Sequence, residues 1–448
     1  MIPFEHIGPL FTDLYELTMA AGYFEYGMAD EATFSLFVRP GGEKTRAFYI
    51  AAGLEDVLEA LGKYRFSAKD ISYLKSTGMF SSDFLACLSR FRFTGDVHAL
   101  PEGTVFFPEE PILEVTAPIM EAQILESYIL NTVGFQIMIA TKAARCVLAS
   151  EGRSLLDFSL RRTHGFDSSL KAARSSYLAG FAGTSNVLAG EKFGIPLSGT
   201  MAHSFVMAFH KEADAFAAFA KTFPNNAIFL IDTYDTLKGA QRAVQVARSM
   251  NSVGRKLLGV RLDSGDMVDL SRKVRCILDE GGQQEVKILA SGDLDEYRIQ
   301  EIIGQGAKID AFGIGTKMGV SADAPYLDIV YKMVQIDGRN VRKLSSDKKT
   351  LAGEKQVFRK VSENGEIEKD VIGLREEQIP GTQPLLETVM KGGRCAPHTR
   401  TTLEKIRKRA SENLAHLDEK YKKLKSPETF PVELSSRLKS IQKTPTKS

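Results

Sequence analysis

Short apolar runs alternate with helical stretches between residues 227 and 315, and this alternation constrains the fold more than any other feature of the sequence. The strand-like runs are AIFLI (227–231), LLGVRL (257–262), VKILAS (286–291) and IDAFGIG (309–315). Strands that alternate with helices of about ten or more residues predict βα units and a parallel sheet. LLDFSL (155–160) and IPLSGT (195–200) fit the same scheme. We therefore expect an α/β fold with an irregular, TIM-like βα barrel of about six to seven strands.

The two ends of the chain predict a second α/β domain. Strand-like segments precede a long helix from about residue 120 to 150, and two hairpins with Asp337-Gly338 and Asn364-Gly365 as turn residues follow the barrel. We expect four parts. Residues 1–150 form an N-terminal α/β domain with a long linking helix, 151–330 the catalytic βα barrel, 331–400 hairpin strands that return to the N-terminal domain, and 401–448 a basic helical or disordered tail.

Composition excludes several classes of protein. With 43% hydrophobic and 25% charged residues, the chain has the composition of a soluble globular protein. No apolar run approaches the ~18 residues of a membrane helix, and the first basic residue, Arg39, lies too late for a signal peptide. We expect a cytoplasmic protein with no membrane contact.

Charge and cysteine usage indicate whether the chain binds nucleic acid, forms disulfides or holds zinc. The net charge is +2, and residues 401–448 alone hold twelve Lys or Arg against six Asp or Glu. Because no repeated alternation of aromatic and basic residues accompanies these charges, we expect a helix packed on the body and no nucleic-acid partner. The four cysteines are scattered along the chain and have no C-x-x-C pair, which predicts ordinary buried thiols without disulfides or zinc.

Polar and glycine-rich residues follow each predicted strand of the barrel. They are Arg161, Thr200 to His203, Asp232, Asp263, Ser291 to Asp293 and Gly313 to Thr316. Active sites of βα barrels lie at the carboxyl ends of the strands, where every strand contributes one loop. His203 alone is a weak signal, because most histidines beside an apolar run are core residues. The whole set favours a functional role.

The strand-end residues have the chemistry of a phosphate and carboxylate site. Glycines in SGD (291–293) and GIGTKMG (313–319) allow close backbone approach to an anion, although a tight turn also needs glycine. Carboxylates such as Asp232 and Asp263 bind either Mg²⁺ or sugar hydroxyls, and the alternative for Asp263 or Ser264 is an N-cap. Phe158 with Arg161 suits a flat ring that carries a carboxylate; the alternative is a buried Phe and a surface Arg.

Together these motifs resemble the nicotinate phosphoribosyltransferases, members of the type II phosphoribosyltransferase family. The resemblance runs from about Thr12 to about Gly373 and includes TDLYELTMAAGYF, DFSLRRTHGFDSS, GTMAHSF, LIDTYDT, GVRLDSGD, SGDLDEYRI, FGIGTKMG and KQVFRK. The family's Pro-Gly before Lys-Lys-Gln-Val is replaced by Ala352-Gly353-Glu354-Lys355.

The resemblance implies an enzyme that makes nicotinate mononucleotide from nicotinate and 5-phosphoribosyl 1-pyrophosphate, the first step of NAD salvage from nicotinate. It implies ATP as co-substrate, Mg²⁺, release of pyrophosphate, a transient phosphohistidine, and a homodimer with shared active sites.

It also implies residue roles. His203 would be phosphorylated, Asp232 would lie near pyrophosphate and Mg²⁺, and Asp263 and Asp293 would bind ribose hydroxyls. Tyr15 from a neighbouring subunit and Phe158 would enclose the pyridine ring, and Arg161 and Arg261 would bind its carboxylate and the ribose. Gly292, Gly315 and Thr316 would surround the 5′-phosphate, and Thr200 would be a further substrate-binding residue.

The nearest alternative is a nicotinamide phosphoribosyltransferase, with the same chemistry on a neutral amide. Ser185 matches a position that looks like aspartate in nicotinamide-using relatives, and a carboxylate there would repel nicotinate. The other interpretation of Ser185 is a cap for the helix at NVLAG. The GTMAHSF motif argues against a quinolinate phosphoribosyltransferase. A catalytically inactive sensor would be expected to lack His203, Asp263 or Arg161, and all three are present. An aldolase would need a lysine at a strand end to form a Schiff base, and none stands out.

Overall fold

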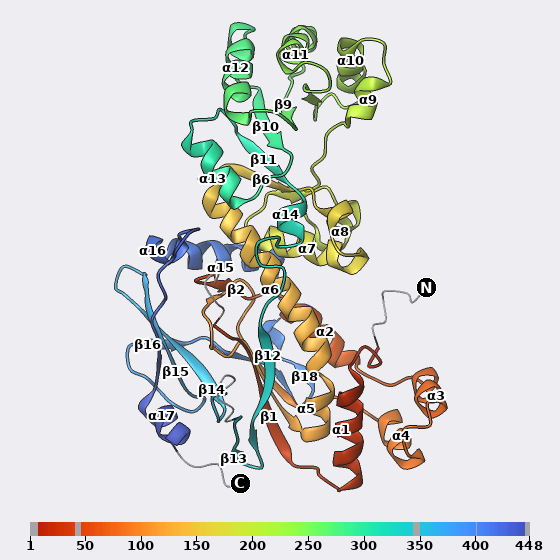
Figure 1. Cartoon of the computed structure of the whole chain (residues 1–448), viewed down its shortest axis with the longest axis vertical. Helices are drawn as coiled ribbons and strands as arrows, with labels where there is room; N and C mark the ends of the chain where they lie inside the picture. Colours follow the sequence, from red (N-terminus) through yellow and green to blue (C-terminus); the bar gives the residue numbers. More distant parts are fainter. Residues whose placement is uncertain (1–7, 41–45, 344–349, 400, 444–448) are drawn as a thin grey trace. The chain divides into compact units, whose positions relative to one another are not determined.

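The computed structural model describes residues 8–40, 46–343, 350–399 and 401–443 (Figure 1). Contacts divide the chain into two units: unit 1 comprises Met1–Thr141 and Tyr326–Ser448, and unit 2 comprises Lys142–Pro325. One division falls within the long helix α6 (Glu126–Ala149). Unit 1 therefore combines both ends of the chain, whereas unit 2 is continuous in sequence.

Unit 2 contains a six-stranded parallel sheet in the order β7-β6-β11-β10-β9-β8. Its strands are β6 (Ser154–Asp157), β7 (Gly183–Thr184), β8 (Ile228–Leu230), β9 (Gly259–Leu262), β10 (Lys287–Ser291) and β11 (Ala311–Ile314). The strand expected at 195–200 is reduced to an isolated parallel bridge between Thr184 and Leu197. Among the described residues no ladder joins β8 to that bridge, so closure into a barrel stays a prediction.

Helices follow these strands as the alternating pattern predicts (Figure 1). They are η1 (Leu160–Arg162), α7 (Phe166–Leu178), α8 (Val187–Phe193), α9 (His203–Met207), α10 (Glu212–Thr222), α11 (Thr236–Asn251), α12 (Met267–Glu280), α13 (Glu296–Gly304) and α14 (Thr316–Gly319). Asp235, Asp266 and Asp295 cap α11, α12 and α13, since each side chain accepts a hydrogen bond from the first turn. These caps fix where each loop ends.

Unit 1 is built on a seven-stranded sheet in the order β13-β12-β1-β5-β3-β17-β18. These strands are β1 (Glu31–Val38), β3 (Asp96–Ala99), β5 (Leu113–Pro118), β12 (Ile329–Ile336), β13 (Arg339–Asn340), β17 (Glu387–Lys391) and β18 (Arg394–Cys395). A four-stranded sheet contains β16 (Thr382–Pro384), β14 (Lys355–Val361), β15 (Ile367–Leu374) and β19 (Val432–Leu434), and a small sheet pairs β2 (Tyr49–Ile50) with β4 (Val105–Phe106). The interior strand β1 pairs with β12 on one side and β5 on the other, so both chain ends share one core.

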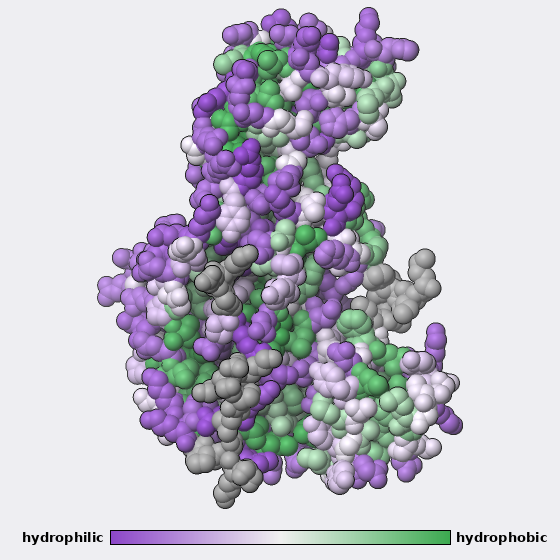
Figure 2. All heavy atoms as spheres, viewed as in Figure 1, coloured by the Kyte–Doolittle hydropathy of each residue, from purple (hydrophilic) through white to green (hydrophobic). Residues whose placement is uncertain are grey.

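The helices of unit 1 include α1 (Leu14–Glu25), whose exposed side belongs to an apolar patch. The others are α2 (Leu54–Lys63), α3 (Ala68–Ser76), α4 (Ser82–Ser89), α5 (Ile119–Ile124), η2 (Pro397–Thr399), α15 (Leu403–Ala415), α16 (Glu419–Lys422) and α17 (Ser436–Lys443). Figure 2 shows weakly polar and apolar side chains gathered over α1, α3 and α4. Large exposed side chains there are Tyr15, Tyr26, Tyr73 and Met79.

The two predicted hairpins differ in their turns. Asp337 and Gly338 both have positive φ, 46° and 66°, between paired Ile336 and Arg339, which is the two-residue turn expected for Asp-Gly. In the second hairpin the pair that closes the loop is Val361 and Ile367. Gly365 has φ 85° there and Asn364 does not have positive φ. Asn364 and Gly365 lie in this loop as expected, and the loop is longer than the two-residue turn of the first hairpin.

The basic tail, described from residue 401 to residue 443, is folded within unit 1. Helix α15 buries Ile406, Ala410 and Leu414, and Asn413 Oδ1 accepts a hydrogen bond of 3.1 Å from the backbone N–H of Val105. Strand β19, which the sequence pattern does not predict, pairs in parallel with β15. The basic residues of α15 therefore accompany an apolar packing face.

Two composition-based expectations need correction. α6 is long and apolar enough to cross a membrane by length and composition alone, but 83% of its apolar window is buried inside the protein. A helix this buried is apolar because it belongs to the core of the protein. The four cysteines are free, yet Cys276 and Cys395 are exposed rather than buried.

Candidate active site

The ends of β8, β9 and β10 bring three predicted loops into direct contact. Asp232, after β8, accepts hydrogen bonds at Oδ2 from the backbone N–H of Asp263 (2.9 Å) and from Ser264 Oγ (2.7 Å). Ser291, at the end of β10, donates its hydroxyl to Asp263 Oδ1. A side chain at Gly292, which has φ 98°, would overlap the carbonyl oxygen of Asp263. Glycine is therefore required where the second and third loops meet.

His203 lies beside this carboxylate cluster at the first position of α9. Its Nδ1 is 3.1 Å from Thr233 Oγ1, and its Nε2 is 3.8 Å from Asp263 Oδ2. The side chain is 40% exposed. The alternative interpretation of His203 as a buried core histidine is therefore wrong.

Arg261 is the most enclosed cation of the site. Its Nη1 donates to Thr200 Oγ1, and its Nε is buried without a hydrogen-bond partner. Burial lowers the pKa of Arg261; the carboxylates of Asp263 and Asp232 oppose this change, and the charge of Arg161 adds to it. Arg161 itself lies in η1 and is exposed. The charge of Arg161 therefore acts on Arg261, which keeps an unused donor.

Phe158 follows β6 and is held by its neighbours. Buried Asp157 accepts hydrogen bonds from the backbone N–H of Ser159 (2.9 Å) and from Thr184 Oγ1 (2.7 Å), and burial raises the pKa of this carboxyl. A side chain at Gly313 would overlap the Phe158 ring. The first glycine of GIGTKMG therefore makes room for an aromatic ring, a role that the sequence-based interpretation as a phosphate loop misses. The ring is half-buried and not a core residue.

Two capping interpretations are wrong. The N-cap of α8 is Asn186, whose side chain accepts a hydrogen bond of 3.2 Å from Ala189 N–H, and Ser185 instead donates its backbone N–H to Asp157 O. The N-cap of α12 is Asp266, which accepts from Val268 and Asp269. The hydroxyl of Ser185 and the carboxylate of Asp263 are therefore not used as helix caps.

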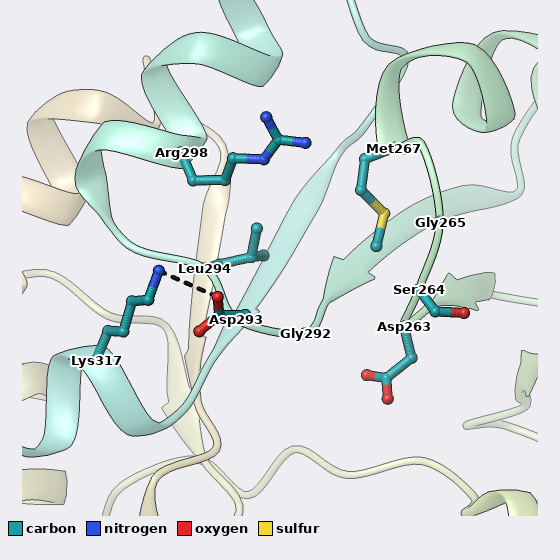
Figure 3. Close-up of a pocket in the computed structure, with 9 residues that line it drawn as sticks. All are labelled: Asp263, Ser264, Gly265, Met267, Gly292, Asp293, Leu294, Arg298 and Lys317. Carbon is teal, nitrogen blue, oxygen red and sulfur yellow. Dashed lines mark ion pairs between the residues drawn. The ribbon is translucent and has the colours of Figure 1, made fainter.

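An open pocket of about 370 Å³ lies between the loops after β9 and β10 (Figure 3). It is lined by Asp263, Ser264, Gly265, Met267, Gly292, Asp293, Leu294, Arg298 and Lys317. Lys317 Nζ lies 3.2 Å from Asp293 Oδ2 and 3.4 Å from Asp295 Oδ2. Gly315 and Thr316 immediately precede Lys317, at the start of α14. Sequence reasoning missed Lys317 and Arg298; a basic residue directly after GIGT was the available signal for Lys317.

Other predicted contacts lie in unit 1. Tyr15 is on α1 and 45% exposed. Lys355, in the loop where the sequence departs from the family pattern, is buried with Nζ 3.1 Å from Glu114 Oε1 and donates to Gly353 O at 2.7 Å. The ammonium group of Lys355 is therefore used inside unit 1.

Asp232 has the property that a magnesium ligand needs. Its Oδ1 is buried and has no hydrogen-bond partner, while Oδ2 is held by the next loop. Within the described parts of the chain, no group of three or more His, Cys, Asp or Glu side chains could hold a metal. Mg²⁺ fits such a site, because it is commonly bound by one or two carboxylates together with substrate phosphates and water.

Comparison with known proteins agrees with this geometry. The nicotinate phosphoribosyltransferase N-terminal domain, family and C-terminal domain models match residues 10–134, 153–366 and 381–442. The chain is 46% identical over 437 residues to a nicotinate phosphoribosyltransferase, pncB2, of Mycobacterium tuberculosis, covering 97% of this chain and 93% of that protein. It is 38% identical to the Bacillus subtilis enzyme of the same name, covering 95% and 92%.

A solved structure of the human nicotinic acid phosphoribosyltransferase superposes with a TM-score of 0.86 at 30% identity. The match covers 96% of this chain and 99% of the human chain. Both the sequence and the mixed α/β fold are therefore shared along nearly the whole length. This chain belongs to the nicotinate phosphoribosyltransferase family.

Proposed function

We propose that this protein joins nicotinate to 5-phosphoribosyl 1-pyrophosphate, forms nicotinate mononucleotide and releases pyrophosphate, in a reaction coupled to ATP. One observation carries the proposal. His203, Asp232 and Asp263 converge at the carboxyl ends of neighbouring parallel strands in a chain 46% identical over 437 residues to a nicotinate phosphoribosyltransferase. A nicotinamide substrate is not favoured, because the relatives named above are all nicotinate enzymes.

Orientation and charge are sufficient for the chemistry. The lone pair of the pyridine nitrogen forms the new bond to C1 of the ribose, and the C1–O bond breaks with its electron pair going to pyrophosphate. The nitrogen has no proton to lose, so no general base is required. Phe158 and Tyr15 would hold the ring flat, while Arg161 and Arg261 pair with its carboxylate. The unused Nε–H of Arg261 supports this assignment.

The phosphoribosyl group would occupy the pocket of Figure 3. Asp263 and Asp293 would accept hydrogen bonds from ribose hydroxyls, and Gly292, Gly315 and Thr316 would surround the 5′-phosphate. Asp232 would hold Mg²⁺ through its buried Oδ1. Bound there, Mg²⁺ supplies positive charge that stabilises the departing pyrophosphate.

His203 is the proposed phosphoryl acceptor. An imidazole nitrogen lone pair bonds to the γ-phosphorus of ATP while the P–O bond to the β-phosphate breaks and ADP leaves with the electron pair. Water later cleaves the N–P bond and returns phosphate and imidazole. The half-exposed position of His203 beside the carboxylate cluster supports this role. The added phosphoryl charge would alternate tight and weak substrate binding.

The assembly is part of the proposal. A homodimer in which Tyr15 completes the site of a neighbouring subunit is supported by the large exposed hydrophobic side chains on and directly after α1 and α3. Closure of the sheet into a barrel is supported by the Thr184–Leu197 bridge, which adds a further parallel connection beyond β7. A cytoplasmic location is supported by the exposed free thiols of Cys276 and Cys395, which suit a reducing compartment.

One experiment tests the function. The purified protein is incubated with nicotinate, 5-phosphoribosyl 1-pyrophosphate and Mg²⁺, with and without ATP, and mononucleotide and ADP are measured. We expect mononucleotide in both reactions and more in the presence of ATP, with ADP as a product. Equal rates with nicotinamide in place of nicotinate would overturn the assignment of the substrate.

A further inference from the structure

The imidazole of His203 has a single close polar neighbour in the part of the chain that the structure describes. Thr233 Oγ1 lies 3.1 Å from Nδ1, a hydrogen-bond distance. Asp263 Oδ2 lies 3.8 Å from Nε2, which is too far for a direct hydrogen bond. Because the side chain is 40% exposed, packing alone does not fix the ring. The contact with Thr233 therefore determines its orientation.

The loop that carries Thr233 is braced on both sides. Asp232, immediately before it, accepts hydrogen bonds from Asp263 N–H at 2.9 Å and from Ser264 at 2.7 Å. Asp235, two residues later, caps α11 by accepting from Lys238 N–H at 2.9 Å. The side chain of threonine is branched at Cβ and has few χ1 rotamers. The hydroxyl is thus presented to His203 from a fixed backbone.

The contact with Thr233 bears on the tautomer of the neutral ring. If Thr233 donates to Nδ1, the proton lies on Nε2 and neither nitrogen has a free lone pair for a phosphoryl group. If Thr233 accepts a hydrogen bond from Nδ1–H, the lone pair on Nε2 stays free, because Asp263 Oδ2 is too far away to form a hydrogen bond with that nitrogen. The second arrangement is the one that leaves a nucleophilic nitrogen.

We infer that Thr233 is a positioning residue for His203, and that its hydroxyl holds the imidazole in the tautomer and orientation needed to accept a phosphoryl group. The inference rests on the phosphohistidine of the proposed function. Phosphoryl transfer requires the attacking lone pair in line with the leaving group, so rotation of the ring lowers the productive fraction. Loss of one ordinary hydrogen bond should slow the formation of phosphohistidine about fivefold.

The test uses the full-length protein and four variants. Thr233→Val removes the hydroxyl but keeps the branched shape, Thr233→Ala removes both, and Thr233→Ser keeps the hydroxyl. Thr222→Val is the matched control, because the hydroxyl of Thr222 donates to the backbone of its own helix, Ala218 O at 2.9 Å. Each protein is mixed with γ-labelled ATP, and the initial rate of acid-labile label on the protein is measured. Nucleotide formation without ATP is measured in parallel.

The inference predicts about a fivefold lower labelling rate in Thr233→Val and Thr233→Ala, and recovery in Thr233→Ser. Thr222→Val should label like the unmodified protein. A normal rate in Thr233→Val, or an equally slow rate in Thr233→Ser, overturns the inference, since the hydroxyl would then be irrelevant. Nucleotide formation without any label on the unmodified protein would overturn the phosphohistidine and this inference together. Absence of nucleotide would reject the proposed function itself.

Discussion

At the residue scale, the two oxygens of Asp232 have unequal surroundings. Oδ2 receives two hydrogen bonds from the next loop, and Oδ1 is buried with none. A buried acceptor without a partner costs free energy, so its retention at a strand end suits a ligand that arrives with positive charge. Arg261 likewise has a buried group without a hydrogen-bond partner, but there the group is a donor, Nε–H, which suits a negatively charged ligand.

The first prediction concerns His203→Ala. We expect this variant to lose the stimulation by ATP and to keep part of the basal transfer, because the carboxylates and arginines that hold the substrates do not depend on the imidazole. Initial rates of mononucleotide formation with and without ATP measure both quantities. Full stimulation in the variant would show that the phosphoryl acceptor lies elsewhere.

The second prediction concerns Ser185, whose hydroxyl is free of a capping role because Asn186 caps α8. We expect the unmodified protein to prefer nicotinate over nicotinamide by at least ~100-fold in kcat/KM, about 2.7 kcal/mol. Ser185→Asp should erode this preference, chiefly by weakening nicotinate, since like charges at about 4 Å cost on the order of 4 kcal/mol in a partly screened site. Steady-state kinetics with both bases measure the change.

If selectivity is unchanged in Ser185→Asp, discrimination belongs to other residues, with Arg161 and Arg261 as the first candidates. Ser185→Ala serves as the control. It removes the hydroxyl without adding charge, and we expect a smaller loss of nicotinate affinity than in the aspartate variant.

Residue identities at the site could be predicted where a sequence motif places them directly after a strand. Asp232, Asp263 and His203 were found in this way, and they do lie together. Thr233, Lys317 and the spatial role of Gly313 were not found. Their importance depends on which loops are neighbours in the sheet, and that order is a property of the tertiary fold.

At the element scale, the parallel strands were predictable because each buried run is bounded by polar residues and followed by an amphipathic helix. Strand β8 (Ile228–Leu230) and strand β10 (Lys287–Ser291) fall within their predicted ranges. The run at 195–200 fails to form a regular strand and contributes a single bridge at Leu197. Local pattern does not reveal whether a run finds a partner, because pairing depends on distant residues.

A buried ion cluster joins α6 to α13 within unit 2. Glu296, fully buried, pairs with Lys142 and accepts from Arg145 Nε at 2.9 Å. We expect Glu296→Ala to lower the free energy of unfolding by about 3–5 kcal/mol, because it leaves buried cations without their shared partner. Glu301→Ala on the same helix is the matched control. Its half-exposed pair with Arg298 should contribute less than about 1 kcal/mol.

Urea denaturation of both variants measures the difference. Equal stability of Glu296→Ala and Glu301→Ala would contradict the prediction, and would mean that water or Asp323, which lies 2.7 Å from Lys142 Nζ, compensates for the lost carboxylate.

Glu16 on α1 gives the protein a pH-dependent stability. Burial raises the pKa of this carboxyl to about 7 from its usual 4.5, although hydrogen bonds from Gln123 and Tyr15 oppose the change. Between these values the folded protein binds a proton that the unfolded chain does not, so stability falls as pH rises from about 4.5 to about 7. Each pKa unit corresponds to about 1.4 kcal/mol, so the full shift corresponds to about 3.5 kcal/mol, and screening by solvent reduces the expected loss to roughly 2–3 kcal/mol.

The variant Glu16→Gln should remove this decline, because an amide can accept the hydrogen bond from Gln123 without a charge. Free energies of unfolding at pH 5 and pH 8 measure the effect. The variant should gain stability relative to the unmodified protein at pH 8 and much less at pH 5; a gap that is constant across this range would contradict the assignment of the carboxyl.

At the scale of the whole molecule, the arrangement of the chain into two units was only partly predictable. Short strands at both ends of the sequence suggest a shared domain, and β1 does pair with β12 along Ala32–Val38. The addition of β19 beside β15 had no local signal, because a three-residue strand is too short to show periodicity.

The proposed sharing of the site between two subunits leads to a prediction about mixed assemblies. If Tyr15 completes the site of a neighbouring subunit, then inactive Tyr15→Ala and inactive Asp263→Ala chains should regain part of their activity when mixed. One site of each heterodimer would then contain both native residues. Recovery is measured after verified subunit exchange; its absence would show that each site is built from one chain.

The pairing of β1 with β12 has a consequence for how the protein is made. Ala32 lies beside Ile336, so the interior strand β1 lacks one partner until the ribosome has synthesised about 300 further residues. At roughly 5–20 residues per second, the nascent strand waits on the order of 15–60 s. During that time its edge and the seven buried positions of β1 are open to wrong partners. Unit 2, continuous in sequence, can complete its own contacts first, and newly made chains should depend on chaperones that cover the N-terminal segment.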